Sequence, residues 1–364
     1  MTTGLGYEDA CLEHDNGSML LDERARTWLD ARHPECPERI ARAYRLLQES
    51  GVASRLTRVP GRRATPDELL LVHSEGHVER VRAACASDEI VWVGPEARAS
   101  RASWDPSLLA VGGLLEAVDH VLAGRLSNAY VLQRPPGHHA SADRAMGFCL
   151  FNAVAVAARY AQGRGLARVA VVDWDVHHGN GTQDIFYADD SVLFVSLHQD
   201  GLYPPGSGTL AEVGTGDGQG LTVNIPLPAG TGDAGYACAF GAVVEPVVSN
   251  FGPDIILVSA GQDPAASDPL GRMSATTEGF RAMAERLASV ANEVCGGRIV
   301  AFQEGGYSVE HMPYCTLAII EALAGLPPSF DGDPLEVDAP TELGGNQLSA
   351  VQRAATGLKR WWPT

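Results

Sequence analysis

Residues 169–181 read VAVVDWDVHHGNG, an apolar run that passes directly into a cluster of acidic residues and histidines. The run Val169–Val172 contains no polar residue, which is typical of a strand buried on both faces of a parallel sheet. Because side chains alternate along an extended chain, Asp173, Asp175 and His177 are expected on one side if the strand persists that far. The segment predicts a central strand with metal-binding side chains at its carboxyl end. Taken alone, it also fits a solvated acidic turn.

The rest of the chain alternates apolar strand-like runs with helical patterns. The central strand described above is predicted to span Arg168–Trp174. The other predicted strands are Ala129–Leu132, Val192–Leu197, Asp254–Ser259 and Arg298–Phe302. The predicted helices are Pro37–Glu49, Ser74–Ala86, Pro106–Ala123, Asn152–Gln162, Ala234–Ser249, Thr277–Cys295 and Val309–Ala324. This alternation predicts an α/β fold with an open, mostly parallel sheet and helices on both faces. No linker interrupts it, so a single domain over residues 1–364 is expected.

Polar segments follow the predicted strands, and one of them is Gly261-Gln262-Asp263. Ligands of open parallel sheets bind at the carboxyl ends of the strands, so these segments are expected to form one site. Asp263 would complete a three-ligand set with Asp175 and His177, which leaves a fourth position for water or substrate, as in catalytic zinc sites. By itself, an Asp after a strand is more often a helix cap or a turn former.

Two further segments carry candidate catalytic side chains. Arg134–His139 is a tight Pro- and Gly-containing loop that ends in two histidines, and such a pair can shuttle protons near neutral pH. Glu304–Tyr307 holds two glycines, which allow close approach of the backbone, before a tyrosine hydroxyl that could donate to an oxyanion. In isolation the first fits a surface loop and the second a turn before a core tyrosine.

Composition excludes several classes of protein. The net charge of −18 argues against a nucleic-acid binder, although it would attract cationic partners or simply favour solubility. The seven cysteines form no C-x-x-C pair, which argues against a disulfide framework and a cysteine-rich zinc site and favours a reducing cytoplasm. No apolar run is long enough to span a membrane, and Met1–Leu12 lacks the pattern of a secretory signal.

The motifs together resemble those of the histone deacetylase family and its bacterial amidohydrolase relatives. They are His33–Arg39, Arg134–His139, Met146–Asn152, Asp173–Gly181, Ser259–Asp263 and Glu304–Tyr307, which span about three quarters of the chain in the family's order. Asn180 stands where class I members carry Asp, so the chain is class II-like. The resemblance implies an arginase/deacetylase-like fold and the removal of an acetyl or other acyl group from a lysine side chain.

The resemblance also implies roles for the site residues. Asp175, His177 and Asp263 would bind Zn²⁺. His139 would be the general base, with His138 as its electrostatic partner, and Tyr307 would polarise the scissile carbonyl. The Asp173 carboxylate would orient His138, and Asn180 would be the partner of His139. Zinc would polarise the amide and acidify a water. A neutral Asn180 stabilises an imidazolium less than a carboxylate does, which leaves the basicity of His139 open.

Further positions follow from the same resemblance. Gly147, Phe148, Tyr203, Pro204, Leu270, Gly305 and Gly306 would contact substrate, and Arg39 would sit near an internal acetate channel unless it is a helix-surface arginine. Asp173, Ser196 and Leu197, with main-chain oxygens of Asp175 and His177, would hold a structural K⁺. Gln262 departs from the aromatic residue usual in class II relatives, which is expected to change local hydrogen bonding.

The nature of the substrate is open at this level. Alternatives to an acyl-lysine peptide or protein are an acetylpolyamine or another small acylated amine, and a catalytically inactive acyl-lysine-binding protein is the alternative outside enzymes. Leu270 favours a peptide, because polyamine-selective relatives carry Glu at that position. Glu96 is a carboxylate that could replace that Glu. Homo-oligomerisation is also left open.

Overall fold

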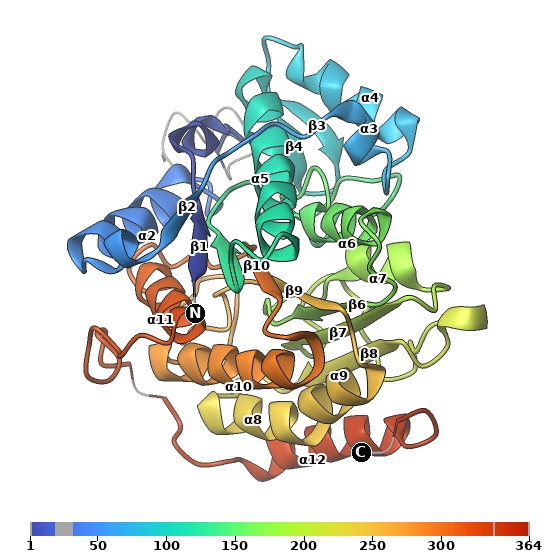
Figure 1. Ribbon diagram of the computed structural model, residues 1–364, viewed down its shortest axis with the longest axis vertical. Coiled ribbons are helices and arrows are strands. Elements are labelled where there is room, and N and C mark those ends of the chain that lie inside the picture. Colours follow the sequence, from blue (N-terminus) through green and yellow to red (C-terminus); the bar gives the residue numbers. More distant parts are fainter. Residues whose placement is uncertain (1, 19–31, 338, 363–364) are drawn as a thin grey trace.

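The sheet predicted from the sequence is the centre of the molecule. A computed structural model describes residues 2–18, 32–337 and 339–362. Eight strands lie in the order β2-β1-β5-β10-β9-β6-β7-β8, and all neighbours pair in parallel (Figure 1). They are β1 (Thr3–Gly6), β2 (Thr57–Val59), β5 (Asn128–Val131), β6 (Val169–Asp173), β7 (Val192–Gln199), β8 (Thr222–Leu227), β9 (Ile255–Ala260) and β10 (Ile299–Gln303). The predicted α/β class is confirmed.

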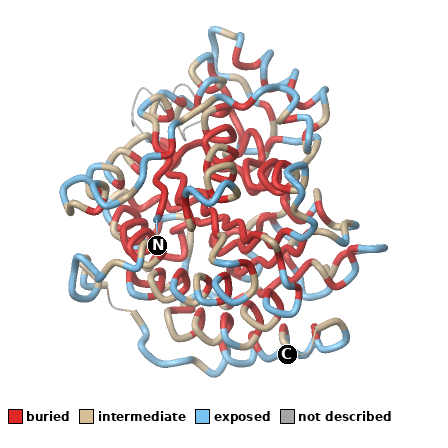
Figure 2. The backbone as a smooth tube through the Cα atoms, viewed as in Figure 1, coloured by how far each residue is buried: buried red, intermediate tan, exposed pale blue. Residues whose placement is uncertain are grey.

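Helices cover both faces of this sheet, and each face has its own apolar core. One core packs the sheet against α2 (Pro37–Glu49), α8 (Asp233–Ala239), α9 (Glu245–Phe251), α10 (Thr277–Cys295), α11 (Met312–Ala324) and α12 (Gly345–Leu358). The other packs it against α3 (Pro66–Leu69), α4 (Glu75–Cys85), α5 (Trp104–Leu122), α6 (Ala153–Gly163) and α7 (Asn180–Phe186). The six strands between the two edge strands are accordingly buried along their whole length, whereas the edge strand β2 exposes Thr57 and Arg58 (Figure 2). No helix within the described ranges has both the length and the apolar character needed to cross a membrane.

The five predicted strands are present, with ends shifted by two residues at most. The sequence did not reveal the edge strands β2 and β8, the strand β1 next to β2, or a small antiparallel hairpin of β3 (Val91–Gly94) and β4 (Ala97–Ala99). These segments are short or contain Gly and Pro, both of which weaken a strand signal. In β1 the glycine serves packing, because a Cβ on Gly4 would lie 2.5 Å from Leu126 Cδ1.

The predicted helix Ala234–Ser249 is present, but it is not α-helical throughout. Helix α8 ends at Ala239, a π-helical turn covers Phe240–Val244, and α9 continues from Glu245. The residues at both junctions keep right-handed helical φ and ψ values, so the chain stays helical through the turn. Pro246 follows the turn directly and has no N–H for an α-helical bond. The whole segment packs on one face of the sheet.

The carboxyl ends of the central strands lie level with one another. Asp173 at the end of β6 pairs with Ser196 of β7 and Ser259 of β9. Strand β6 stops at Asp173, so Asp175 and His177 lie in the loop beyond it. Alternation along a strand therefore does not place Asp175 and His177 on one side, because the strand ends before them. The conformation of the loop brings them together instead.

Candidate metal and catalytic site

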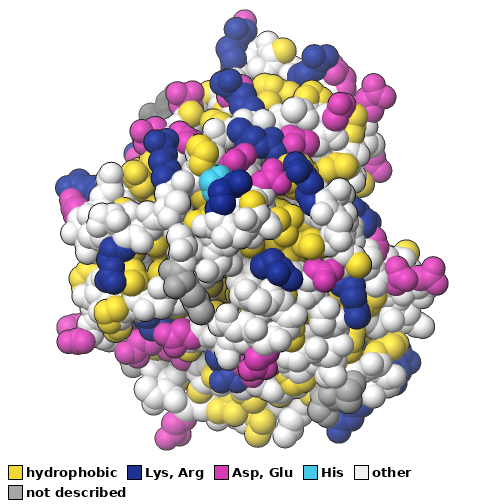
Figure 3. Space-filling model, viewed as in Figure 1, with side chains coloured by type: hydrophobic (Ala, Val, Ile, Leu, Met, Phe, Trp, Pro, Cys, Tyr) yellow, Lys and Arg dark blue, Asp and Glu magenta, His cyan; other side chains and the backbone are white. Residues whose placement is uncertain are grey.

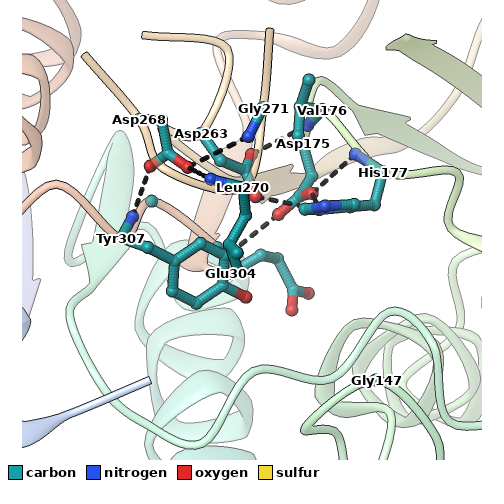
Figure 4. A network of polar contacts seen from close by, with 12 residues as sticks. Gly147, Asp175, Val176, His177, Asp263, Asp268, Leu270, Gly271, Glu304 and Tyr307 are labelled. Carbon is teal, nitrogen blue, oxygen red and sulfur yellow. Dashed lines mark hydrogen bonds and ion pairs between the residues drawn. The ribbon is translucent and has the colours of Figure 1, made fainter. Parts of the chain in front are cut away.

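The loops after β6 and β9 bring together the three side chains predicted as metal ligands. Ligand atoms of Asp175, His177 and Asp263 all lie within 4.8 Å of one another, and all three residues are buried (Figure 4). His177 Nδ1 is 3.0 Å from Asp175 Oδ1 and 3.1 Å from Asp263 Oδ2. Two carboxylates and an imidazole, contributed by two loops, thus converge on one point.

Backbone amides hold the two carboxylates in place. Asp175 Oδ1 accepts from the His177 N–H (3.0 Å) and its Oδ2 from the Gly305 N–H (2.8 Å), while Asp263 Oδ1 accepts from the Val176 N–H (2.8 Å). Among the described residues Asp263 Oδ2 has no well-aligned donor, even though it is buried. A buried anionic oxygen of this kind is costly unless a cation compensates it.

The charges of the cluster also suit a cation. Burial, together with the neighbouring Asp175 carboxylate, raises the pKa of Asp263 to about 7. Although burial acts in the opposite direction, the contacts with Asp175 and Asp263 raise the pKa of His177 to about 10. Both shifts arise because two carboxylates flank one imidazole, an arrangement that favours positive charge between them.

The two adjacent histidines have the partners expected for them. His138 Nδ1 lies 2.9 Å from Asp173 Oδ2, and His139 Nδ1 lies 2.8 Å from Asn180 Oδ1. Burial lowers the pKa of His139 well below its ordinary value, and His138 and His177 lower it further. Against the effect of burial, Asp175 and Asp173 raise the pKa of His138 well above its ordinary value. His139 is thus the neutral member of the pair.

Tyr307 lies across the cavity from the histidines. Its ring centroid is 6.5 Å from that of His177 and 5.8 Å from that of Phe148. Arg39 sits behind it, with its guanidinium carbon 4.7 Å from the ring centroid, and donates to the carbonyls of Gly306 (2.5 Å) and Glu304 (2.6 Å). Arg39 is fully buried, so its alternative interpretation as a helix-surface arginine is wrong.

A cavity of about 440 Å³ leads from the surface to these side chains. Its walls are His33, Trp92, Glu96, Arg98, His139, Gly147, Phe148, His177, Leu202, Tyr203, Leu270 and Tyr307. Four of the residues predicted to contact substrate line this cavity: Gly147, Phe148, Tyr203 and Leu270. Pro204, Gly305 and Gly306 are buried and are not among the walls.

Gly305 lies directly against the metal-ligand set. Its N–H donates to the Asp175 carboxylate, and a Cβ at Gly305 would lie 2.1 Å from Asp263 Oδ2. The glycine is needed because this loop passes so close to both carboxylates. Contact of Gly305 and Gly306 with substrate stays a prediction.

A known family accounts for this arrangement. The family profile described as the histone deacetylase domain matches residues 33–323. The chain belongs to the histone deacetylase family. It is 41% identical to a histone deacetylase-like amidohydrolase of Pseudomonas aeruginosa over 89% of this chain and 86% of that protein. It is 40% identical to a probable deacetylase of Archaeoglobus fulgidus over 92% of this chain and 89% of that protein.

A solved structure carries the same likeness. The crystal structure of the HDA15 HD domain superposes with a TM-score of 0.89 at 35% identity, covering 100% of this chain and 97% of that one. The deacetylase fold expected from the motifs is therefore confirmed, and the chain is a hydrolase of the deacetylase and amidohydrolase type.

Some residues of this deacetylase site were not predicted. The buried Glu304 carboxylate accepts from the N–H groups of Gly137 (2.5 Å) and His138 (3.2 Å) and from Ser259 Oγ (3.1 Å). It therefore fixes the histidine loop against β9 and β10, and burial raises its pKa to about 7. Glu304 opens the predicted motif, but its partners are more than 40 residues away, so nothing local revealed its role.

The hairpin β3–β4 also escaped prediction, and it shapes the wall of the cavity. The N–H groups of Gly147 and Phe148 donate to the carbonyls of Pro95 (3.0 Å) and Glu96 (2.9 Å). Phe148 has a φ of 67°, a strained value for a non-glycine residue, and these bonds from the hairpin turn help to hold it there. Glu96 itself lines the mouth of the cavity.

Two other expectations concern residues beside the site. Sheet register places Asp173 next to Ser196, and Leu197 follows it, so the residues expected to hold K⁺ lie together; K⁺ binding stays a prediction. Gln262 donates to the Tyr130 hydroxyl (2.9 Å) and accepts from Gln303 Nε2 (2.5 Å). Gln262 is thus part of a buried polar network beside the metal-ligand loop, and a difference from class II relatives stays a prediction.

Proposed function

We propose that this chain is a zinc-dependent deacetylase that removes acetyl or other acyl groups from lysine side chains. The observation that carries the proposal is the convergence of an Asp–His–Asp set with Tyr307 and His139 at one cavity. Three protein ligands with room for a fourth are the arrangement of catalytic zinc sites. Asp263 Oδ2 has no aligned hydrogen-bond donor among the described residues, and the group 3.1 Å from it is His177 Nδ1, which belongs to another candidate ligand; both observations are consistent with a cation there.

Asp175, His177 and Asp263 would hold the zinc. When bound, zinc supplies Lewis acidity to the acyl carbonyl and lowers the pKa of a water molecule. Asp173, Ser196 and Leu197, with main-chain oxygens of the β6 loop, would hold a structural K⁺.

The remaining groups would do the proton transfer and stabilise charge. His139 is neutral and donates its Nδ1–H to Asn180, so its Nε2 is free to accept a proton from the attacking water. Asp175 and Asp173 raise the pKa of His138, and Asp173 holds its Nδ1, so His138 would carry positive charge that favours the developing oxyanion. Tyr307 lines the same cavity, and its hydroxyl would donate to that oxyanion. A protonated histidine would then deliver the proton to the leaving nitrogen as the C–N bond breaks, and the products are a carboxylate, which is acetate for an acetyl group, and a free amine.

The shape of the cavity favours a long, apolar acylated chain. Phe148 and Tyr203 wall it, and Leu270 lines the same space. Methylenes gain about 0.8 kcal/mol each from such burial. Because Leu270 offers no charge, we infer that an acyl-lysine in a peptide or protein is preferred over an acetylpolyamine.

Glu96 is the specific observation that favours the second candidate, an acetylpolyamine deacetylase. Its carboxylate lines the same cavity and could pair with the distal ammonium of a polyamine. A hydrogen bond to a charged group contributes about 1.5–3 kcal/mol. Charged side chains of both signs are interspersed on the face shown in Figure 3, so no uniform field there selects one substrate.

A substrate panel tests both parts of the proposal. The zinc-loaded protein is assayed with an acetyl-lysine peptide, acetylputrescine and acetylspermidine, then again after chelation and after zinc is restored. We expect the highest kcat/KM on the peptide, loss of turnover with chelation, and recovery with zinc. Leu270→Glu should shift the preference toward polyamines, and Glu96→Gln, the matched variant, should shift it further toward the peptide.

Full activity without a divalent metal would refute the zinc assignment. A wild-type preference of about tenfold or more for acetylpolyamines, equal to about 1.4 kcal/mol, would refute the peptide assignment and leave the polyamine candidate.

A further inference from the structure

Asp268 lies in the loop between β9 and α10, five positions after the candidate ligand Asp263. It is only 7% exposed, and none of the ion pairs in the described ranges involves it. A carboxylate buried in this way is costly unless hydrogen bonds satisfy its oxygens. Its partners therefore show what it is there to hold.

Each oxygen of Asp268 serves a different loop (Figure 4). Oδ1 accepts from the N–H groups of Leu270 (2.9 Å) and Gly271 (3.3 Å), within its own loop. Oδ2 accepts from the N–H groups of Tyr307 (2.6 Å) and Ser308 (3.2 Å), in the loop after β10. One side chain thus binds four backbone donors and ties the two loops together.

The first of these loops is itself fixed to the metal-ligand set. A Cβ added to Gly271 would lie 2.3 Å from the carbonyl oxygen of Asp263, so the turn at Leu270–Gly271 packs directly on the ligand's backbone. Asp268 therefore links the backbone of Tyr307 to the backbone of Asp263 by way of the Leu270–Gly271 turn. These contacts fix the position of Tyr307 relative to Asp263.

We propose that Asp268 is a positioning residue for the deacetylase reaction, which sets the Tyr307 hydroxyl at its working distance from the metal-ligand set. This rests on the proposed function, since Tyr307 is the oxyanion donor there. Asp268 touches neither the ligand side chains nor the cavity. Its effect passes through the backbone of Tyr307. A misplacement of about 1 Å in a catalytic group costs on the order of a hundredfold in rate.

An acidic side chain is required by the count of donors. Four N–H groups need two acceptor oxygens, and Asn supplies one oxygen and an NH₂ group. Asp268→Asn keeps the shape of the side chain but sets an NH₂ group against one pair of N–H groups. Whichever pair loses its acceptor, the link between the Leu270–Gly271 turn and Tyr307 is broken.

The test uses the zinc-loaded full chain with one acetyl-lysine peptide. For Asp268→Asn we expect unchanged zinc content, KM within about threefold of wild type and kcat lowered by about tenfold to a hundredfold, as for loss of a group that acts only in the transition state. Asp254→Asn is the matched control. Asp254 also accepts two backbone N–H bonds, from Ala167 and Arg168, but lies at the start of β9, far from the site. Its kcat should stay within about twofold of wild type.

A double-mutant cycle separates positioning from general damage. If Asp268 acts through the Tyr307 hydroxyl, the double variant should have a kcat less than about threefold below that of Tyr307→Phe alone. Multiplicative losses would overturn the proposal, as would a single variant with normal kcat. Should Asp268→Asn fail to fold, Asp268→Glu, which keeps two acceptor oxygens but shifts them, is expected to show the same selective loss of kcat, and a wild-type kcat would overturn the proposal. A wild type inactive on the peptide would instead refute the proposed function.

Discussion

His73 makes the folded state of this protein sensitive to acid. It is 2% exposed and lies just before α4, where Nδ1 is 3.0 Å from the Ser141 carbonyl oxygen and Nε2 accepts from the Asn152 N–H at 2.9 Å. These partners fix a neutral ring with its proton on Nδ1, because a protonated Nε2 could not accept. Burial, with a smaller effect of His77, lowers the pKa of His73 to about 3.

The magnitude follows from the difference between the folded and unfolded states. The unfolded chain protonates His73 near its ordinary pKa of about 6.5, whereas the folded chain does so only near 3. Above the unfolded pKa there is no penalty, and the loss of stability grows as the pH falls from about 6.5 toward 3. At pH 5 it amounts to about 2 kcal/mol.

The assay compares unfolding free energies, from denaturant titration, at several pH values between 7.5 and 4.5. His73→Gln keeps a donor and an acceptor on a side chain that does not titrate, so the loss between pH 7 and 5 should be about 2 kcal/mol smaller than in wild type. The control is Val81→Ala, a fully buried position on α4, which lowers stability at every pH and leaves the pH slope unchanged. An unchanged slope in His73→Gln would refute the reasoning.

Three predictions concern the site. Tyr307→Phe should retain zinc and lose about a hundred- to thousandfold in kcat, as expected for one oxyanion donor, and a rate near wild type would make Tyr307 a packing residue. Asp263→Ala should lose zinc in metal analysis, because it removes one of three ligands; full zinc occupancy with full activity would contradict the ligand assignment. Gly305→Ala should also lower zinc affinity although it replaces no ligand residue, because its Cβ would lie 2.1 Å from Asp263 Oδ2 and displace that carboxylate; normal affinity, measured by competition with a chelator, would show that the loop can move to make room.

The sequence by itself determined the central strands, the major helices and the set of polar segments at the strand ends. The reason is that these signals are local: Val169–Val172 is apolar without interruption, and Thr277–Cys295 keeps one helical pattern over its whole length. Parallel strands place their carboxyl ends at one edge of the sheet, so even the meeting of Asp175 with Asp263 follows from their places after two such strands.

Tertiary structure alone decided how those side chains are held and what surrounds them. The bonds of Glu304 to the His138 loop and of Asp268 to Tyr307 join residues 39 to 167 positions apart, and no local pattern encodes such pairings. The hairpin that carries Trp92 and Glu96 to the cavity mouth was missed because its strands are too short to show alternation. The identity of a ligand is a property of its residue type, which the sequence shows directly. Its position depends on backbone hydrogen bonds between distant loops, which only the folded chain forms.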